Sequence, residues 1–217
     1  MAQEIEIKRL LDAPGYERLR THLDTLATAE HHEQHNLYLD LPDAALRTAG
    51  AMLRLRTVGE RMELTLKARA RVDDGVMTAQ ELERALTTPY ERAFWLQRPL
   101  PWPDVVTRIA DWLDATGLTH LAEREASLQE VGSTANLRRV YRLESGVPHW
   151  PHLLTLELDK TRYPGGVTRL ELECEHAQAH EIAPIVDVWL KSLGVAATAA
   201  TETKYAQFLR LAAEHAE

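Results

Sequence analysis

Residues 4–8 are Glu4-Ile5-Glu6-Ile7-Lys8, so charged and apolar side chains alternate along the chain. An alternation of period two predicts a β-strand with two carboxylates and an ammonium on one face and two isoleucines on the other. Carboxylates two residues apart on a strand lie about 6–7 Å from each other, and their repulsion costs roughly 2–3 kcal/mol at an effective dielectric constant of about 20. We therefore expect a bound cation, or a neighbouring strand that carries Arg and Lys, beside this strand.

The same alternation recurs later in the chain and predicts further strands. Turn residues at Gly59-Glu60 and at Pro164-Gly165-Gly166 join two pairs of these stretches into hairpins. Helical spacing of apolar residues predicts helices as well, the first capped by Asp12 and the second capped by Asp104 and ended by Gly117. The expected strands are 36–40, 52–58, 61–67, 80–86, 121–131, 137–143, 154–159 and 170–175; the expected helices are 12–27, 90–117, 179–193 and 201–215; and 69–75 is expected to be a loop.

Composition places the chain among ordinary globular proteins. Its 217 residues are 45% hydrophobic, enough for a core, and we expect a single domain over 1–217. The net charge of −8 argues against nucleic acid or an anionic membrane as partner, because both favour a positive surface. The single cysteine excludes an internal disulfide, and no stretch reaches the roughly 18 apolar residues of a transmembrane helix. Without a secretory signal, a cytoplasmic location is expected.

The charged strand faces divide by sign. One interpretation is an antiparallel sheet that is covered on one side and solvated on the other. The alternative is a closed barrel whose apolar faces pack outward under helices and whose charged faces line the interior. Such an interior would bind a polyanion through Arg and Lys, and magnesium or manganese through carboxylate oxygens. The acidic positions are Glu4, Glu6, Asp159, Glu171 and Glu173, and the basic ones are Lys8, Arg54, Arg56, Lys67 and Arg138.

A series of short motifs favours the barrel. Residues 4–8 resemble the ExExK motif of the CYTH superfamily, the triphosphate tunnel metalloenzymes, and later motifs follow in the order typical of that family. The resemblance covers nearly the whole chain. The later motifs are Tyr38-Leu39-Asp40, Leu53-Arg54-Leu55-Arg56, Leu64-Thr65-Leu66-Lys67, Arg138 before Tyr141, Leu158-Asp159, Glu171-Leu172-Glu173 and Lys204-Tyr205.

This resemblance implies an α+β fold: an eight-stranded antiparallel β-barrel, or tunnel, with a charged interior and flanking helices. Glu4, Glu6 and Lys8 would be catalytic. The implied triphosphate ligands are Lys8, Arg54, Arg56, Lys67, Arg138 and Lys204, and the implied ligands of Mg²⁺ or Mn²⁺ are Glu4, Glu6, Asp159, Glu171 and Glu173. Two features depart from the pattern. Gln80-Glu81-Leu82-Glu83 lacks an Arg that many relatives carry before the acidic pair, and Arg139 competes with Arg138 for the inward position.

The expected activity is hydrolysis of the terminal phosphate of a linear triphosphate. Inorganic triphosphate is the preferred substrate, with thiamine triphosphate and nucleoside triphosphates as alternatives. One metal would orient the phosphates and a second would acidify the attacking water. A class IV-type adenylate cyclase is the main competing hypothesis, and a polyphosphate-binding module without turnover is a third. The oligomeric state stays open, with a homodimer as one option.

Several conspicuous residues are better explained as structural. We expect His31, His32 and His35 to form a solvated segment before a strand that begins at Leu37, and Cys174 to face the apolar layer. The tryptophans in helical or proline-rich stretches are expected to cover the barrel. Glu81, Glu83 and Glu175 stay undecided between the interior and the rim. The tryptophans that we expect to cover the barrel are Trp95, Trp102, Trp112 and Trp189.

Overall fold

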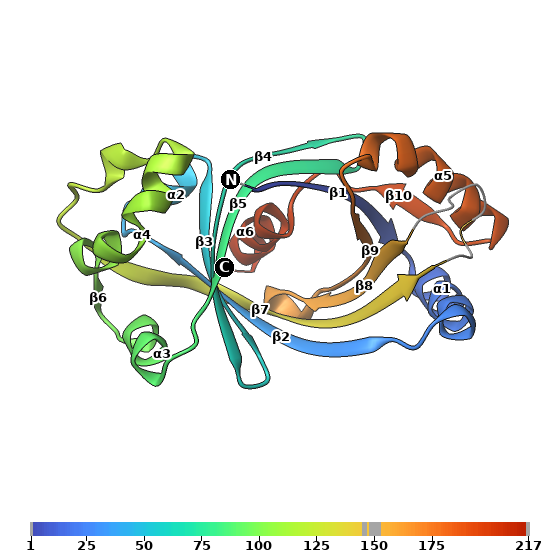
Figure 1. Ribbon diagram of the computed structural model, residues 1–217, viewed down its shortest axis with the longest axis horizontal. Helices are drawn as coiled ribbons and strands as arrows, with labels where there is room; N and C mark the ends of the chain where they lie inside the picture. Colours follow the sequence, from blue (N-terminus) through green and yellow to red (C-terminus); the bar gives the residue numbers. More distant parts are fainter. Residues whose placement is uncertain (1, 145–146, 148–152, 216–217) are drawn as a thin grey trace. The chain divides into compact units, whose positions relative to one another are not determined.

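The computed structural model describes residues 2–144, 147 and 153–215. Eight long strands form a hydrogen-bonded ring in the order β1-β5-β4-β3-β2-β7-β8-β9, which a pairing of β9 with β1 closes (Figure 1). This pairing confirms the predicted eight-stranded antiparallel barrel. The ring strands are β1 (Ala2–Leu11), β2 (Glu30–Asp40), β3 (Ala51–Val58), β4 (Arg61–Asp73), β5 (Val76–Ala85), β7 (Ser127–Leu143), β8 (Leu154–Arg162) and β9 (Thr168–Glu175).

Two short strands and six α-helices accompany the ring among the described residues. β10 pairs with β1, and β6 pairs with β7. The short strands are β6 (Leu100–Pro101) and β10 (Ala197–Ala199), and the helices are α1 (Ala13–Leu26), α2 (Ala45–Thr48), α3 (Pro89–Leu96), α4 (Trp102–Thr116), α5 (Ala179–Ser192) and α6 (Lys204–Glu214).

The chain forms two compact units, each with its own hydrophobic core. The first unit consists mainly of Gln34–Ala70 and Ala79–Thr134. Its core joins the apolar faces of β3 and β4 to α3 and α4, and it buries Trp95, Trp102 and Trp112. These three tryptophans are structural, as predicted.

The second unit contains Glu4–Glu33, Arg71–Thr78 and the chain after Ala135. Its core packs α1 and α5 against the apolar faces of β1, β8 and β9, and it includes Ile7, Cys174 and Trp189. Ile5 packs at the edge of the same core. The two isoleucines of the first strand therefore share its apolar face, as their alternation with charged residues predicts.

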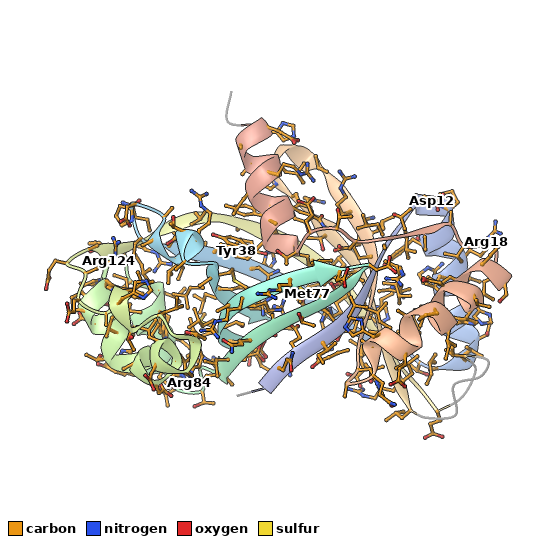
Figure 2. The ribbon with its side chains drawn as sticks, turned by 90° about the horizontal axis from the view of Figure 1, so that it is seen from above. Asp12, Arg18, Tyr38, Met77, Arg84 and Arg124 are labelled. Atoms are coloured by element: carbon orange, nitrogen blue, oxygen red, sulfur yellow. The ribbon has the colours of Figure 1, made fainter. Side chains whose placement is uncertain are left out.

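The helix ends follow from local sequence. Asp12 caps α1 by accepting a hydrogen bond from the backbone N–H of Gly15 at 2.7 Å (Figure 2). Thr203 caps α6 in the same way. Gly117 ends α4 with a φ of 74°, a left-handed conformation that favours glycine. The prediction for Asp104 is wrong, because α4 begins two residues earlier, at Trp102, and Asp104 lies in its first turn.

Three strand predictions are too short because polar residues on both faces resemble a loop. β2 begins at Glu30, so His31, His32 and His35 lie within a strand and do not form a separate segment before it. β4 continues to Asp73 and turns at Gly75 into β5, where a loop over 69–75 was expected. β7 runs unbroken from Ser127 to Leu143 where two strands were expected.

Candidate active site

Strand register determines which charged side chains of the second unit become neighbours. β8 pairs with β9 so that Asp159 lies opposite Glu171 and Glu157 lies opposite Glu173. The pairing of β9 with β1 places Lys8 opposite Glu173. Like charges directly opposite each other destabilise an antiparallel sheet. The two facing carboxylate pairs therefore require cations close by.

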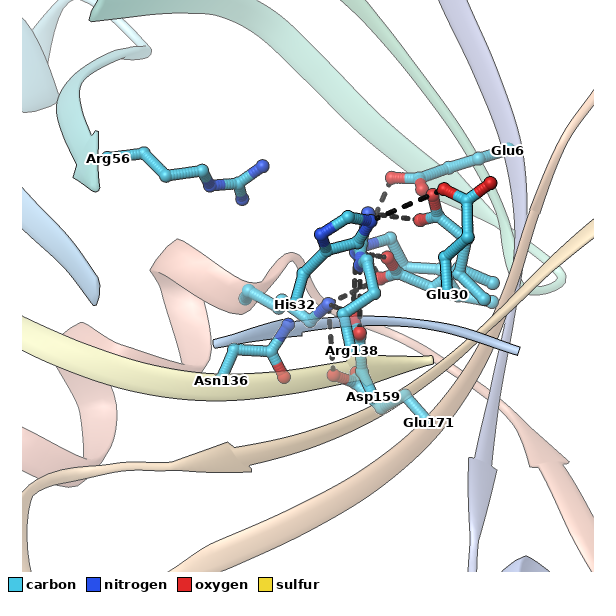
Figure 3. Close-up of polar contacts among 12 residues, drawn as sticks. Glu6, Glu30, His32, Arg56, Asn136, Arg138, Asp159 and Glu171 are labelled. Atoms are coloured by element: carbon cyan, nitrogen blue, oxygen red, sulfur yellow. Dashed lines mark hydrogen bonds and ion pairs between the residues drawn. The ribbon is translucent and has the colours of Figure 1, made fainter. Parts of the chain in front are cut away.

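Arg138 on β7 is the most highly connected of these cations. Its Nε and Nη2 donate to the two oxygens of Asp159 at 2.9 and 2.6 Å, and Nη2 also donates to Glu173 at 2.6 Å (Figure 3). Nη1 pairs with Glu157. The three carboxylates lie on the strand faces opposite the hydrophobic core. Arg138 on β7 therefore binds carboxylates of both β8 and β9 and links the three strands. Arg139 instead lies near Tyr141.

Two lysines complete the set of cations. Lys8 Nζ donates to Glu173 Oε1 at 2.5 Å and lies 3.1 Å from Glu6 Oε1. Lys204, the first residue of α6, pairs with Asp159, and its Nζ lies 2.9 Å from Glu173 Oε1. Each lysine therefore contacts a carboxylate that Arg138 also contacts.

We call these residues together the acidic cluster. Five carboxylates face three cations, which leaves a formal charge of −2 when every group is ionised. Asp159 and Glu171 are completely buried, and Glu173 is 3% exposed. A buried excess of negative charge is costly unless a cation binds to it. The acidic cluster consists of Glu6, Lys8, Arg138, Glu157, Asp159, Glu171, Glu173 and Lys204.

Burial, with a smaller contribution from neighbouring carboxylates, raises the pKa of two carboxyl groups in the acidic cluster. Burial is the main cause that raises the pKa of Glu157 to about 7; nearby Glu173 and Asp159 raise it further, and Arg138 opposes them. Burial also raises the pKa of Glu171, against the opposing effect of Lys204 and Lys8. For these two groups the neighbouring cations do not offset the effect of burial.

Asp159, Glu173 and Lys8 are held in their ionised forms by their partners in the acidic cluster. Burial acts to raise the pKa of Asp159, but Arg138 and Lys204 hold it below its ordinary value. Burial opposes ionisation of Glu173 too, yet Lys204, Lys8 and Arg138 lower its pKa strongly. The pKa of Lys8 lies well above its ordinary value, because the carboxylates around it outweigh the effect of burial.

The first unit carries its own charged group on β3, β4 and β5. Arg54 Nη2 donates to Thr65 Oγ1 at 3.0 Å and lies 3.7 Å from carboxylate oxygens of Glu81 and Glu83. Lys67 Nζ lies 3.2 Å from Glu81 Oε2. We call these five residues the Arg54 group. Glu81 and Glu83 therefore lie on the same face of the sheet as Arg54 and Lys67 and form ion pairs with them.

Arg56 makes a separate contact in the same unit. Its Nε donates to Asn36 Oδ1 at 2.8 Å. Asn36 is buried and lies directly opposite Arg56 in the pairing of β2 with β3. Its Nδ2 donates in turn to Thr134 Oγ1 at 3.4 Å. Asn36 therefore fixes the orientation of a predicted phosphate ligand.

The structure brings together most, but not all, of the residues expected in the site. Glu6 belongs to the acidic cluster, while Glu4 lies half-buried on the same face of β1. Glu175 lies opposite Glu6 at the end of β9 and is exposed. Glu157 was not among the predicted site residues, although its position two residues before Asp159 places both carboxylates on the same strand face and could have indicated it.

The donor set of the acidic cluster fits a hard divalent cation in its chemistry. Buried carboxylate oxygens are the ligands that magnesium and manganese prefer. Among residues 2–144, 147 and 153–215, no three His, Cys, Asp or Glu side chains are already gathered as a metal site. Lys8, Arg138 and Lys204 occupy the carboxylates instead. A metal ion would therefore have to compete with these cations.

Two other groups named in the sequence analysis do not take part. His32 Nε2 lies 3.7 Å from a carboxylate oxygen of Glu30, beyond hydrogen-bonding distance, and His31 and His35 are exposed on β2. Cys174 is buried in the second core, and burial raises the pKa of its thiol to about 12. A thiol with that pKa is not a nucleophile at neutral pH. In the described part of the chain, no helix is both long and apolar enough to cross a membrane.

Several solved structures share this fold. The adenylyl cyclase candidate HpAC1 from Hippeastrum, described as having a dominant triphosphatase activity, is 26% identical with a TM-score of 0.77, and the match covers 95% of each chain. An adenylate cyclase candidate from Bacillus halodurans is 21% identical with a TM-score of 0.62, over 96% of this chain and 99% of the other. A protein from Pyrococcus horikoshii OT3 is 20% identical with a TM-score of 0.57, over 95% and 98%.

The family model of the CYTH domain matches residues 2–204, from the first strand to the lysine that begins α6. The match therefore includes every strand of the ring and every residue of the acidic cluster. The chain belongs to the CYTH domain family.

Proposed function

We propose that this protein is a divalent-metal-dependent hydrolase that removes the terminal phosphate of a linear triphosphate, with inorganic triphosphate as the preferred substrate. The observation that carries this proposal is the acidic cluster, in which four buried carboxylates and the partly exposed Glu157 surround three cations and leave a negative excess. Carboxylates alone would suit a metal, and cations alone would suit an anion. Their combination suits a metal-bound polyphosphate.

The cations of the cluster would bind phosphate oxygens. Arg138 already donates two parallel hydrogen bonds to the oxygens of Asp159, the geometry with which a guanidinium also binds phosphate. Lys8 and Lys204 both contact Glu173 and supply compact positive charges there. When substrate binds, we propose that these three side chains exchange carboxylate partners for phosphate oxygens. The proposed further phosphate ligands, from the family resemblance, are Arg54, Arg56 and Lys67.

The carboxylates released by this exchange would hold Mg²⁺ or Mn²⁺. The proposed ligands are Glu4, Glu6, Asp159, Glu171 and Glu173, all of which lie on the charged faces of β1, β8 and β9. A bound divalent cation would neutralise phosphate charge and make a nearby water more acidic. The protein's own contribution is to hold the phosphates in line and to keep its charges in fixed positions before the substrate arrives.

Adenylate cyclase activity is the second candidate, because the Hippeastrum and Bacillus halodurans proteins are both described as adenylate cyclase candidates. Cyclisation requires a pocket that aims the ribose hydroxyl at the α-phosphate, whereas hydrolysis requires only the phosphate site. The description of the Hippeastrum protein as predominantly a triphosphatase favours hydrolysis.

Product analysis tests the proposal. The protein is incubated with Mg²⁺ or Mn²⁺ and, separately, with inorganic triphosphate, thiamine triphosphate and ATP. We expect orthophosphate, formed fastest from inorganic triphosphate, and no product when EDTA is present. Cyclic AMP as the main product from ATP would support the cyclase, and binding without any product would leave a polyphosphate-binding module. The matched variants are Glu171→Gln, which should lose activity, and Glu60→Gln in an exposed turn, which should keep it.

A further inference from the structure

Helix α6 brings a second polar side chain to the acidic cluster. Gln207 follows Lys204 by three residues, so both side chains project from the same face of the helix. Gln207 is only 2% exposed, and its Nε2 donates to Glu171 Oε1 at 3.3 Å. The opposite orientation of the amide would place two acceptor oxygens against each other, so the contact fixes which atom faces Glu171.

Within the part of the chain that the structure describes, this contact leaves one buried acceptor oxygen on each of the two side chains without a hydrogen-bond donor. Among the described residues, neither Gln207 Oε1 nor Glu171 Oε2 has a hydrogen-bond partner, and both atoms are buried. Lys204 Nζ lies 3.7 Å from Glu171 Oε2, which makes an ion pair but is too far for a hydrogen bond. Buried acceptors in folded proteins are almost always satisfied. The pair therefore points to a ligand that offers positive charge or hydrogen-bond donors.

We infer that Gln207 is a positioning residue for a divalent cation in the acidic cluster. Its amide nitrogen holds Glu171, and its amide oxygen, together with Glu171 Oε2, provides two oxygens to the cation or to a water that the cation carries. This inference rests on the metal dependence in the proposed function. Carbonyl oxygens of amides are ordinary ligands of hard cations.

Because its amide is uncharged, Gln207 suits this position better than a carboxylate or an apolar side chain would. The acidic cluster already carries a formal charge of −2 when every group is ionised, and Glu171 is completely buried within it. A sixth carboxylate here would add repulsion when no metal is bound. An apolar side chain would remove both the donor for Glu171 and the acceptor. Glutamine supplies both without adding charge.

The test measures Mn²⁺ binding to the substrate-free protein by electron paramagnetic resonance and calorimetry, so it does not depend on turnover. Gln207→Met keeps the length of the side chain but removes both polar atoms, and should weaken Mn²⁺ binding by about 10–100-fold. Gln207→Glu keeps an oxygen in place and should bind Mn²⁺ at least 10-fold more tightly than Gln207→Met. Arg210→Met, on the exposed side of the same helix, is the matched control and should bind as the wild type does.

Equal Mn²⁺ affinity of Gln207→Met and the wild type would overturn the inference, as would equal weakness of Gln207→Met and Gln207→Glu. Thermal melts show whether each variant is folded, and Gln207→Leu, which also lacks both polar atoms, replaces Gln207→Met in these comparisons if Gln207→Met does not fold. Failure of the proposed function can be distinguished from failure of this inference. If only the proposed function fails, the wild type binds Mn²⁺ but releases no phosphate from triphosphate, and the differences in Mn²⁺ affinity between the Gln207 variants remain.

Discussion

Replacing Glu157 with Gln should stabilise the metal-free protein at alkaline pH. Burial, with smaller contributions from Glu173 and Asp159, raises the pKa of Glu157 from 4.5 to about 7 in the folded protein. Because the pKa is higher in the folded than in the unfolded state, the ionised side chain opposes folding. This penalty is absent below pH 4.5, grows between pH 4.5 and 7, and is complete above that range.

The size of the effect follows from the two pKa values. A difference of about 2.5 between them corresponds to about 3 kcal/mol of unfolding free energy. The side chain of Glu157 is 26% exposed, so solvent screens the interaction only in part. Glutamine is nearly isosteric with the protonated acid and never ionises. The variant should therefore match the wild type near pH 4.5 and exceed it by about 3 kcal/mol at pH 8.5.

Urea unfolding, followed by tryptophan fluorescence in EDTA-containing buffer, measures this difference at several pH values from 5 to 8.5. Glu60→Gln, in the exposed turn between β3 and β4, controls for the loss of a surface carboxylate. A stability difference between Glu157→Gln and the wild type that does not change with pH would refute the reasoning. Addition of Mg²⁺ should reduce the advantage of the variant, because a bound cation stabilises the ionised carboxylates of the wild type.

Three further changes test other parts of the account. Glu6→Gln should lower metal-dependent phosphate release by about 100-fold while the circular dichroism melt stays within a few degrees of the wild type, and full turnover would exclude Glu6 from the site. Asp159→Asn should lower the unfolding free energy by about 3 kcal/mol, because Arg138 and Lys204 lose a buried carboxylate; an unchanged denaturation midpoint would contradict this. Gly75→Ala should lower the melting temperature measured by calorimetry, since Gly75 has a φ of +69° and an added Cβ would lie 2.9 Å from the carbonyl oxygen of Lys8; an unaltered melt would show that the turn adjusts freely.

The fold was predictable where one strand face is apolar and the other charged. Ile5 and Ile7 alternate with charged residues in β1, and Leu170, Leu172 and Cys174 do so in β9, so the pattern itself indicates which face meets the core. It was only partly predictable in β2: the expected strand 36–40 is present, but β2 begins at Glu30, and Gln34 and Asn36 within it are buried polar residues. The burial of Asn36 depends on a hydrogen bond from the Arg56 guanidinium on the paired strand β3, and the sequence of β2 itself does not show that partner.

The charged residues of the site were largely predictable as candidates, but their contacts were not. Alternation placed Asp159 and Glu171 on charged faces, while the register that sets them opposite each other comes from the pairing of β8 with β9. Gln207 gave no signal, because a polar residue on an amphipathic helix is usually solvent-exposed. Only the packing of α6 shows that this glutamine is buried against a carboxylate.

The central claim is that the acidic cluster binds divalent metal together with a triphosphate. The most direct measurement is anomalous diffraction from crystals grown with Mn²⁺ and a non-hydrolysable triphosphate analogue. We predict manganese peaks about 2.1 Å from carboxylate oxygens of Asp159, Glu171 or Glu173, with Arg138 and Lys204 turned from those carboxylates to phosphate oxygens. Manganese bound elsewhere, with the ion pairs of Arg138 and Lys204 to Asp159 intact, would contradict the account.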